Sequence, residues 1–191
     1  MRIALIGRVA MHVELFDGQT VKTRYFYELL KDICDVDDVL LVDMYEYKKH
    51  FFKVLIQSIV ALIKCDKIVL LISINGRKFF FPFFFYLNKI FKKDIYHSLI
   101  GGRLANNIEK YPSWRKYINS FKVNWVESCE MVSKLKKMGV KNAEYLPNFK
   151  KINIINKNEI TPYIKYPYEF CTFSRVQKKK VLQMLLRQSM R

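Results

Sequence analysis

Several residue types and patterns are scarce in this sequence, and each absence excludes a class of protein. Only 6 glycines and 5 prolines occur in 191 residues, which excludes collagen-like and linker-like chains. The four cysteines are far apart and form no C-x-x-C pair, so we expect neither a zinc site nor a disulfide framework, and this usage fits a reducing cytosol. The longest apolar stretches, 54–65 and 79–87, are shorter than the roughly 20 residues of a membrane-spanning helix. No cleavage-site pattern follows the apolar run 1–7, so we do not expect export.

Acidic residues are also few relative to basic ones. The chain has 34 Lys and Arg against 17 Asp and Glu, a net charge of +17. This surplus indicates an anionic partner, which could be nucleic acid, an acidic membrane surface or a phosphorylated substrate. Because the sequence has no zinc-finger spacing and no aromatic RNP pattern, we expect no nucleic-acid partner. Residues 150–191 alone hold ten Lys or Arg and two acids, so this tail needs an explanation of its own.

Apolar residues make up 51% of the chain, and their order predicts alternating strands and helices. The expected strands are 3–6, 38–44, 67–74, 94–100, 123–126 and 143–146, and the expected helices are 20–31, 50–64, 79–93 and 130–138. Near-continuous apolar strands separated by helices are typical of a mostly parallel sheet that helices cover on both faces. The sequence therefore predicts a Rossmann-like α/β fold, with ligands bound beyond the carboxyl ends of the strands.

The same pattern also predicts where turns occur and which helix faces are buried. Asn75-Gly76 is expected to be a turn that closes the third strand, with Pro82 in the first turn of the following helix. In the first helix, near-helical spacing indicates an apolar face made of Val21, Tyr25, Leu29 and Ile33. Gly139 is expected to stop the helix 130–138.

Changes in composition and periodicity along the sequence divide the chain into three parts. Residues 1–150 are expected to form the α/β domain. Residues 151–168 are polar, show little periodicity and are interpreted as a linker. The segment 169–176 then has the pattern of a new first strand, so 169–191 is interpreted as the start of a second domain.

The loop between the first strand and the first helix is a candidate anion site. Gly18 and the free N–H groups at a helix start can receive an anion, and Lys22 adds a positive charge one turn into the helix. The segment is neither a Walker loop nor a G-x-G-x-x-G motif, and a glycine at such a place is more often only a turn.

Two histidines are candidates for chemistry at the strand ends. His97 lies in the strand that precedes Gly101-Gly102, where it could be catalytic or could contact an acceptor, although a buried structural histidine is the commoner case. His12 follows the first strand at the expected rim of the cleft. His50 opens an apolar helix and is expected at the surface.

The aromatic run 79–86 has basic flanks on both sides. Such a segment could lie at a membrane interface. The alternative is a core helix packed on the sheet, which the run also fits.

Five segments carry a resemblance to a known family: LFDGQTVKTR after the first strand, ING after the third strand, IYHSLIGGRL, NAEYLPNFK and FCTFSRV. In this order and spacing the chain resembles the amino-terminal half of a family-4 (group 1) glycosyltransferase with the GT-B fold, of the kind found in bacterial surface-polysaccharide synthesis. The resemblance extends almost to Lys180. It implies a retaining, hexosyltransferase-type transfer from a nucleotide-sugar donor to a glycan or lipid-linked acceptor, without a metal or a resident cofactor.

The resemblance also assigns roles to residues. It implies that Gly18 faces the donor phosphates, with Gly101 and Gly102 on the acceptor side. It identifies Arg175 and Lys180 with the arginine and lysine of the R-x-x-x-x-K signature, which would hold the donor diphosphate. The expected location is cytoplasmic, at the inner face of a membrane with an anionic surface.

The chain departs from the family after Lys180. The family has a glycine there and later a glutamate pair in an E-x7-E pattern, whereas this chain has Val181 and ends eleven residues after Lys180. We interpret the tail as a truncation by a frameshift and expect the chain to be inactive alone. The alternative is a small non-catalytic basic module that docks an anionic membrane or a partner glycosyltransferase.

Overall fold

The structure, a computed structural model, describes residues 1–149 except residues 16 and 34. Contacts along the chain separate a unit Met1–Ile152 from the remaining residues. The expected linker 151–168 and the expected second domain 169–191 lie outside the described residues. So do Arg175 and Lys180.

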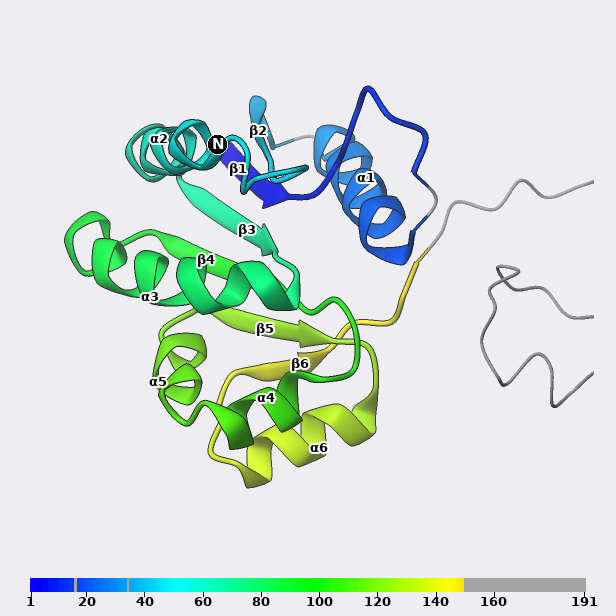
Figure 1. The fold of residues 1–191 in the computed structure, drawn as a ribbon, viewed down its shortest axis with the longest axis vertical. Coiled ribbons are helices and arrows are strands. Elements are labelled where there is room, and N and C mark those ends of the chain that lie inside the picture. The colour runs from blue at the N-terminus through cyan, green and yellow to red at the C-terminus, as the bar shows by residue number, and fades with distance from the viewer. Residues whose placement is uncertain (16, 34, 150–191) are drawn as a thin grey trace, which may run out of the picture. The chain divides into compact units, whose positions relative to one another are not determined.

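The predicted Rossmann-like α/β fold is confirmed. Six parallel strands form one sheet in the order β2-β1-β3-β4-β5-β6 (Figure 1). The strands are β1 (Arg2–Gly7), β2 (Asp38–Asp43), β3 (Lys67–Leu71), β4 (Asp94–Ser98), β5 (Val123–Val126) and β6 (Ala143–Tyr145). The register aligns Gly7 with Asp43 on one side and with Leu71 on the other, so three strands end at the same level.

Helices cover both faces of the sheet. They are α1 (Gly18–Lys31), α2 (Phe51–Lys64), α3 (Ile74–Phe91), α4 (Leu104–Lys110), α5 (Ser113–Asn119) and α6 (Cys129–Lys137). One apolar cluster joins the sheet to α2–α6 and a second joins it to α1. Figure 1 shows α1 on one side of the sheet, with α2, α3 and α5 on the other. This separation follows from the topology, because β2 lies to one side of β1 and all later strands lie to the other.

Two expectations for the start of α3 are wrong. Ser73 is the N-cap, so Asn75-Gly76 lies in the first helical turn instead of forming a turn. A Cβ at Gly76 would come within 2.7 Å of the Ile72 side chain, so this glycine permits close packing between the start of α3 and the end of β3. Because α3 begins at Ile74, Pro82 lies in its interior instead of its first turn, where it lacks the N–H that a helix interior normally uses.

The buried face of α1 also differs from the expected one. The helix buries Thr23, Phe26 and Leu30, whereas Leu29 and Ile33 are 48% and 42% exposed. The helical spacing was predicted correctly, but the predicted buried face of α1 is displaced by about one residue from the observed one. The short helices α4 and α5 were not predicted at all.

The carboxyl-terminal stop of α6 was predicted correctly. Gly139 follows the C-cap Met138 and has a φ of +82°, a conformation that favours glycine. Its backbone N–H donates to the Lys136 carbonyl at 3.0 Å, and the Val140 N–H donates to the Leu135 carbonyl.

Candidate functional site

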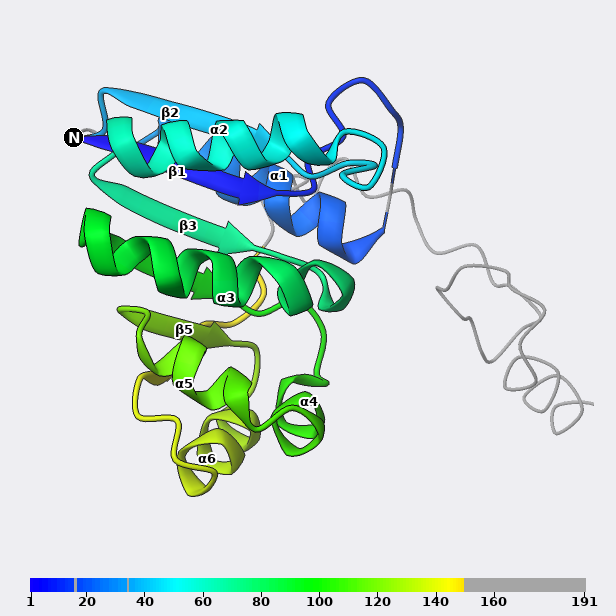
Figure 2. The same cartoon turned by 60° about the vertical axis from the view of Figure 1, so that its left-hand side comes forward.

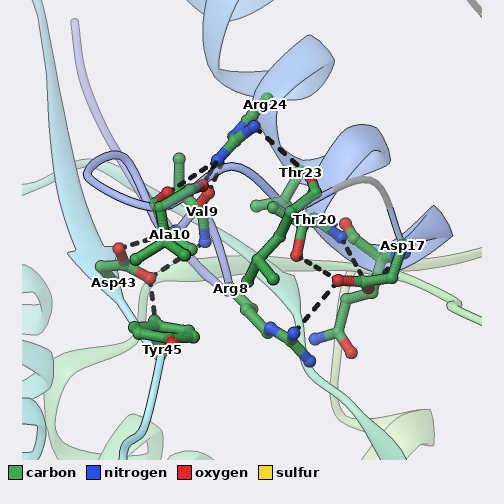
Figure 3. Close-up of polar contacts among 12 residues, drawn as sticks. Arg8, Val9, Ala10, Asp17, Thr20, Thr23, Arg24, Asp43 and Tyr45 are labelled. Atoms are coloured by element: carbon green, nitrogen blue, oxygen red, sulfur yellow. Dashed lines mark hydrogen bonds and ion pairs between the residues drawn. The ribbon is translucent and has the colours of Figure 1, made fainter.

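The loop after β1 is held from the β2 side by a carboxylate. Asp43, the last residue of β2, accepts hydrogen bonds from the backbone N–H groups of Val9 at 2.9 Å, Ala10 at 2.8 Å and Tyr45 at 2.9 Å (Figure 3). One side chain thereby fixes the chain as it leaves both β1 and β2. Ala10 is held in a left-handed conformation with a φ of +50°, a strained geometry that these bonds support.

Arg24 of α1 binds the backbone carbonyl groups of the same loop. The Arg24 guanidinium donates to the carbonyl oxygens of Val9 at 2.9 Å, Ala10 at 2.6 Å and Val13 at 2.8 Å. Val9 and Ala10 are buried, and these bonds pair carbonyl groups that would otherwise be left unsatisfied. Asp43 and Arg24, from two different elements, therefore both hold this loop at the carboxyl edge of the sheet.

Asp17 joins this loop to the start of α1. As the N-cap it accepts from the Gln19 and Thr20 N–H groups at 3.2 Å each and from the Thr20 hydroxyl at 2.8 Å. It also pairs with the Arg8 guanidinium at 3.1 Å. Partial burial acts to raise the pKa of Asp17, but the Thr20 hydrogen bonds and the Arg8 charge outweigh it, so the pKa lies below its ordinary value.

Replacing Asp17 with Ala is expected to lower the free energy of unfolding by about 1 kcal/mol, since it removes the side-chain cap of α1. Urea unfolding at neutral pH measures this change. Glu28→Ala, an exposed acid later in the same helix, is the control and should change stability by less than about 0.5 kcal/mol. An equal loss in both variants would show that the cap contributes nothing of its own.

A pocket opens at the carboxyl edge of the sheet, among the segments that follow β1, β2 and β3, where the strand order reverses. We call it the switch-point pocket. It has a volume of about 410 Å³. Its lining includes the charged residues Arg8, Glu46, Lys48 and Lys49, with Gln19, Tyr45, Tyr47, Ser73 and Asn75. Pockets of open parallel sheets bind ligands at this place, and the volume falls in the range of small-molecule sites.

Arg8 gives the switch-point pocket a charged group with unused hydrogen-bonding capacity. Its guanidinium lies 5.8 Å from the centre of the Tyr45 ring, which orients it by a cation–π contact. Its Nη2 is paired with Asp17 and its Nε is buried, so Nη1 is the remaining nitrogen, and it makes no hydrogen bond within the described part of the chain. A guanidinium that keeps free donors can bind a phosphate or a sugar hydroxyl.

A second pocket, the β2-edge pocket, lies on the other side of Tyr45. It has a volume of about 370 Å³, and its lining includes His12, Asp43, Tyr45, His50, Lys53 and Gln57. His12 is thus beside a pocket at the carboxyl edge, where it was expected. His50, which was expected only at the surface, lines the same pocket.

The three glycines of the expected site lie at the carboxyl edge of the sheet. Gly18 begins α1, and Gly101-Gly102 follow β4. A Cβ at Gly18 would meet nothing within 4 Å, while Gly101 has a φ of +80°. Packing therefore leaves space at Gly18, and Gly101 is needed for its backbone conformation. Substrate binding by these glycines stays a prediction.

Lys22 is held by structural contacts. Its ammonium donates to the Leu99 carbonyl at 3.0 Å and pairs with the Glu127 carboxylate at 2.7 Å. The side chain is only 9% exposed, so it links α1 to the ends of β4 and β5. Substrate binding by Lys22 also stays a prediction, and these contacts already use the charge that it would offer to an anion.

His97 is fully buried on the face of the sheet opposite α1. Its Nδ1 lies 3.1 Å from the Asn124 side-chain oxygen, and its ring packs edge-on against Phe81. Burial, together with the nearby Arg77 charge, lowers the pKa of His97 to about 3. It lines neither pocket. This placement agrees with the structural alternative, and no contact of His97 supports a catalytic role.

The described residues contain no group of three or more His, Cys, Asp and Glu side chains that could hold a metal ion. Neither does any helix among them have the length and apolar character to cross a membrane.

We also compared the chain with protein-family models, curated proteins and solved structures, and none of them matched.

Proposed function

We propose that this chain is the acceptor-side domain of a retaining glycosyltransferase that acts in the synthesis of a surface polysaccharide. The observation that carries the proposal is the switch-point pocket, with the partly unpaired Arg8 beside the ordered loop. The segment LFDGQTVKTR, one of the five that carry the resemblance, supplies Asp17 and Arg24, the residues that cap α1 and hold this loop. The segment therefore has a physical role at the pocket.

The proposed acceptor is a glycan, either free or linked to a lipid through phosphate. Arg8 would hold its phosphate or a hydroxyl, and Gln19, Ser73 and Asn75 would supply neutral hydrogen-bonding groups. The rings of Tyr45 and Tyr47 give the pocket apolar surface, as small-molecule sites usually have. The nucleotide-sugar is a co-substrate, and its diphosphate is assigned to Arg175 and Lys180. The domain would work in the cytoplasm at the inner face of a membrane, and alone it would bind without transferring sugar.

Ligand binding to the chain as it exists tests this proposal. In saturation-transfer NMR, a short-chain prenyl-diphosphate sugar should bind, and a nicotinamide dinucleotide should not. Arg8→Ala should weaken binding at least about tenfold, because a charge-assisted hydrogen bond contributes about 1.5–3 kcal/mol. Arg2→Ala is the matched control, since Arg2 lies at the opposite end of β1.

Two results would count against the proposal. Binding of the dinucleotide without the sugar ligand would indicate a different Rossmann-like function. An unchanged affinity in Arg8→Ala would show that the acceptor does not bind in the switch-point pocket.

The second candidate is a non-catalytic module that docks an anionic membrane or a partner glycosyltransferase. It is favoured by the excess of basic residues between residues 51 and 93, which include α2 and α3. A module of this kind would bind vesicles or its partner but none of the sugar ligands, so the same NMR experiment separates the two functions.

A further inference from the structure

The two longest neighbouring helices on one face of the domain contain no acidic residue. Between residues 51 and 93 there are eight Lys or Arg and a single acid, Asp66, which lies after α2. In Figure 2, α2 and α3 lie side by side in front of the sheet, and the Phe51 and Phe79 rings meet across them with centroids 4.9 Å apart. The two helices therefore lie on the same face of the domain and touch at these rings.

This surface exposes large apolar side chains in two helical stripes. On α2 they are Phe52, Ile56 and Ile63, which are 76%, 60% and 57% exposed. Their spacing of four and seven residues puts them on one side of the helix. The opposite side of α2 buries Val54, Ser58, Ala61 and Leu62.

The stripe on α3 has the same character. It consists of Phe79, Tyr86 and Ile90, at 41%, 55% and 73% exposure. With Ile74, α2 and α3 hold seven of the twelve large apolar side chains exposed in the described part of the chain. Scattered exposed apolar residues are normal, but their concentration on two neighbouring helices of one face indicates an interaction surface.

Lysines surround these stripes. Lys53 and Lys64 lie at the two ends of α2, and Lys78 and Lys89 lie on α3, all exposed. Lys89 also sits 5.6 Å from the centre of the Tyr86 ring. No ion pair joins any of these four lysines to a carboxylate among the described residues. Their charge is therefore available to an external anion.

We propose that the α2–α3 surface, defined by Phe52, Ile56, Ile63, Phe79, Tyr86, Ile90 and these four lysines, docks on an anionic lipid bilayer. Aromatic and aliphatic side chains enter the interface between headgroups and acyl chains, while lysines pair with anionic headgroups. A second copy of the chain fits the surface poorly, because two such faces would bring unpaired lysines together. Nucleic acid fits poorly as well, since it would leave the aliphatic stripes without an apolar partner.

Docking of this kind also orients the pockets. In a parallel sheet with helical crossovers, α2 and α3 begin at the carboxyl edge, and Lys53 and Gln57 of α2 line the β2-edge pocket. The pocket opening is then at the rim of the docked surface, within reach of the polar end of an amphiphile. The inference extends the membrane part of the proposed function but does not depend on sugar binding, so the two can fail separately.

Vesicle co-sedimentation with the chain as it exists tests the docking. We expect binding to vesicles of phosphatidylglycerol and phosphatidylcholine, little binding to phosphatidylcholine alone, and loss of binding at high salt. The pair Lys53→Gln and Lys64→Gln should lower the partition coefficient about 30-fold, at roughly fivefold for each lysine. The pair Phe52→Gln and Ile56→Gln should lower it about tenfold, because less apolar surface enters the interface.

Matched variants separate this surface from the overall charge. Lys136→Gln with Lys137→Gln changes two exposed lysines on α6, and Leu29→Gln with Ile33→Gln changes two exposed apolar residues at α1 and just beyond it. Both pairs should leave binding nearly unchanged, and thermal unfolding confirms that each variant is folded.

Three outcomes would overturn the inference. Equal losses in the α6 pair and the α2 pair would mean that only net charge matters. Equal binding to neutral vesicles would exclude anionic lipid as the partner. Self-association abolished by Phe52→Gln and Ile56→Gln would make the surface a protein interface.

Discussion

Lowering the pH from 7 to 5 is expected to destabilise the domain by about 2 kcal/mol through a single buried histidine. His97 has no exposed surface, and burial is the main reason that its pKa falls to about 3 from the ordinary 6.5. The positive charge of Arg77 acts in the same direction. Arg77 is itself buried, which lowers its own pKa to about 10, but it stays charged at neutral pH.

The direction of this change in stability follows from proton binding in the folded and unfolded states. Between pH 6.5 and pH 3 the unfolded chain holds a proton on this histidine and the folded chain does not. Stability is therefore at its full value above pH 6.5 and falls steadily as the pH drops toward 3. Each pH unit within this window costs about 1.4 kcal/mol.

Urea unfolding at pH 7 and pH 5 measures the effect. In His97→Gln the pH-dependent part should be absent, whatever constant loss the substitution causes. His50→Gln, at an exposed position, is the control and should keep the wild-type dependence. If His97→Gln lost as much stability between pH 7 and pH 5 as the wild type, the histidine would not be the cause.

The sequence predicted the sheet well because its central strands, β1 and β3, are buried on both faces. Segments such as Ile3–Ile6 and Ile68–Leu71 are continuous apolar runs, and such runs can lie in few places other than the centre of an α/β sheet. The helices α4 and α5 were missed since they have only seven residues each, too few for a clear period. They are held by tertiary burial of Leu104, Trp114 and Ile118.

The candidate site was only partly predictable. The sequence indicated which edge of the sheet holds the loops and pockets, but it did not single out Arg8, Arg24 or Asp43. The contacts of Asp43 span more than thirty residues, and no local pattern records which backbone groups it meets. One signal was present, because an aspartate that ends a buried strand needs hydrogen-bond partners at that edge.

The aromatic run 79–86 shows how helical period decides between two interpretations. Phe80, Phe81 and Phe84 are fully buried, whereas Phe79 and Tyr86 face outward. The core-helix interpretation therefore holds for most of the run. The exposed stripe on α2 could not be assigned from the sequence, because that helix is apolar on most faces and only the sheet determines which face is covered.

Phe81→Ala is expected to be the most damaging single substitution considered for this domain. The ring is fully buried and contacts His97, Trp114 and Phe121 at centroid distances of 5.1, 5.4 and 5.5 Å. It thus joins α3 to β4, to α5 and to the chain that leads into β5. Removing a buried phenyl ring costs about 3–5 kcal/mol, from lost burial and from the cavity left behind.

Thermal unfolding should show this loss as a fall in Tm of about 10 °C. Ile90→Ala, on the same helix but 73% exposed, should change stability by less than about 0.5 kcal/mol. In the vesicle assay Ile90→Ala should weaken binding more than Phe81→Ala does, since Ile90 belongs to the α2–α3 surface and Phe81 does not. Comparable destabilisation by the two substitutions would mean that α3 buries a different face from the one described.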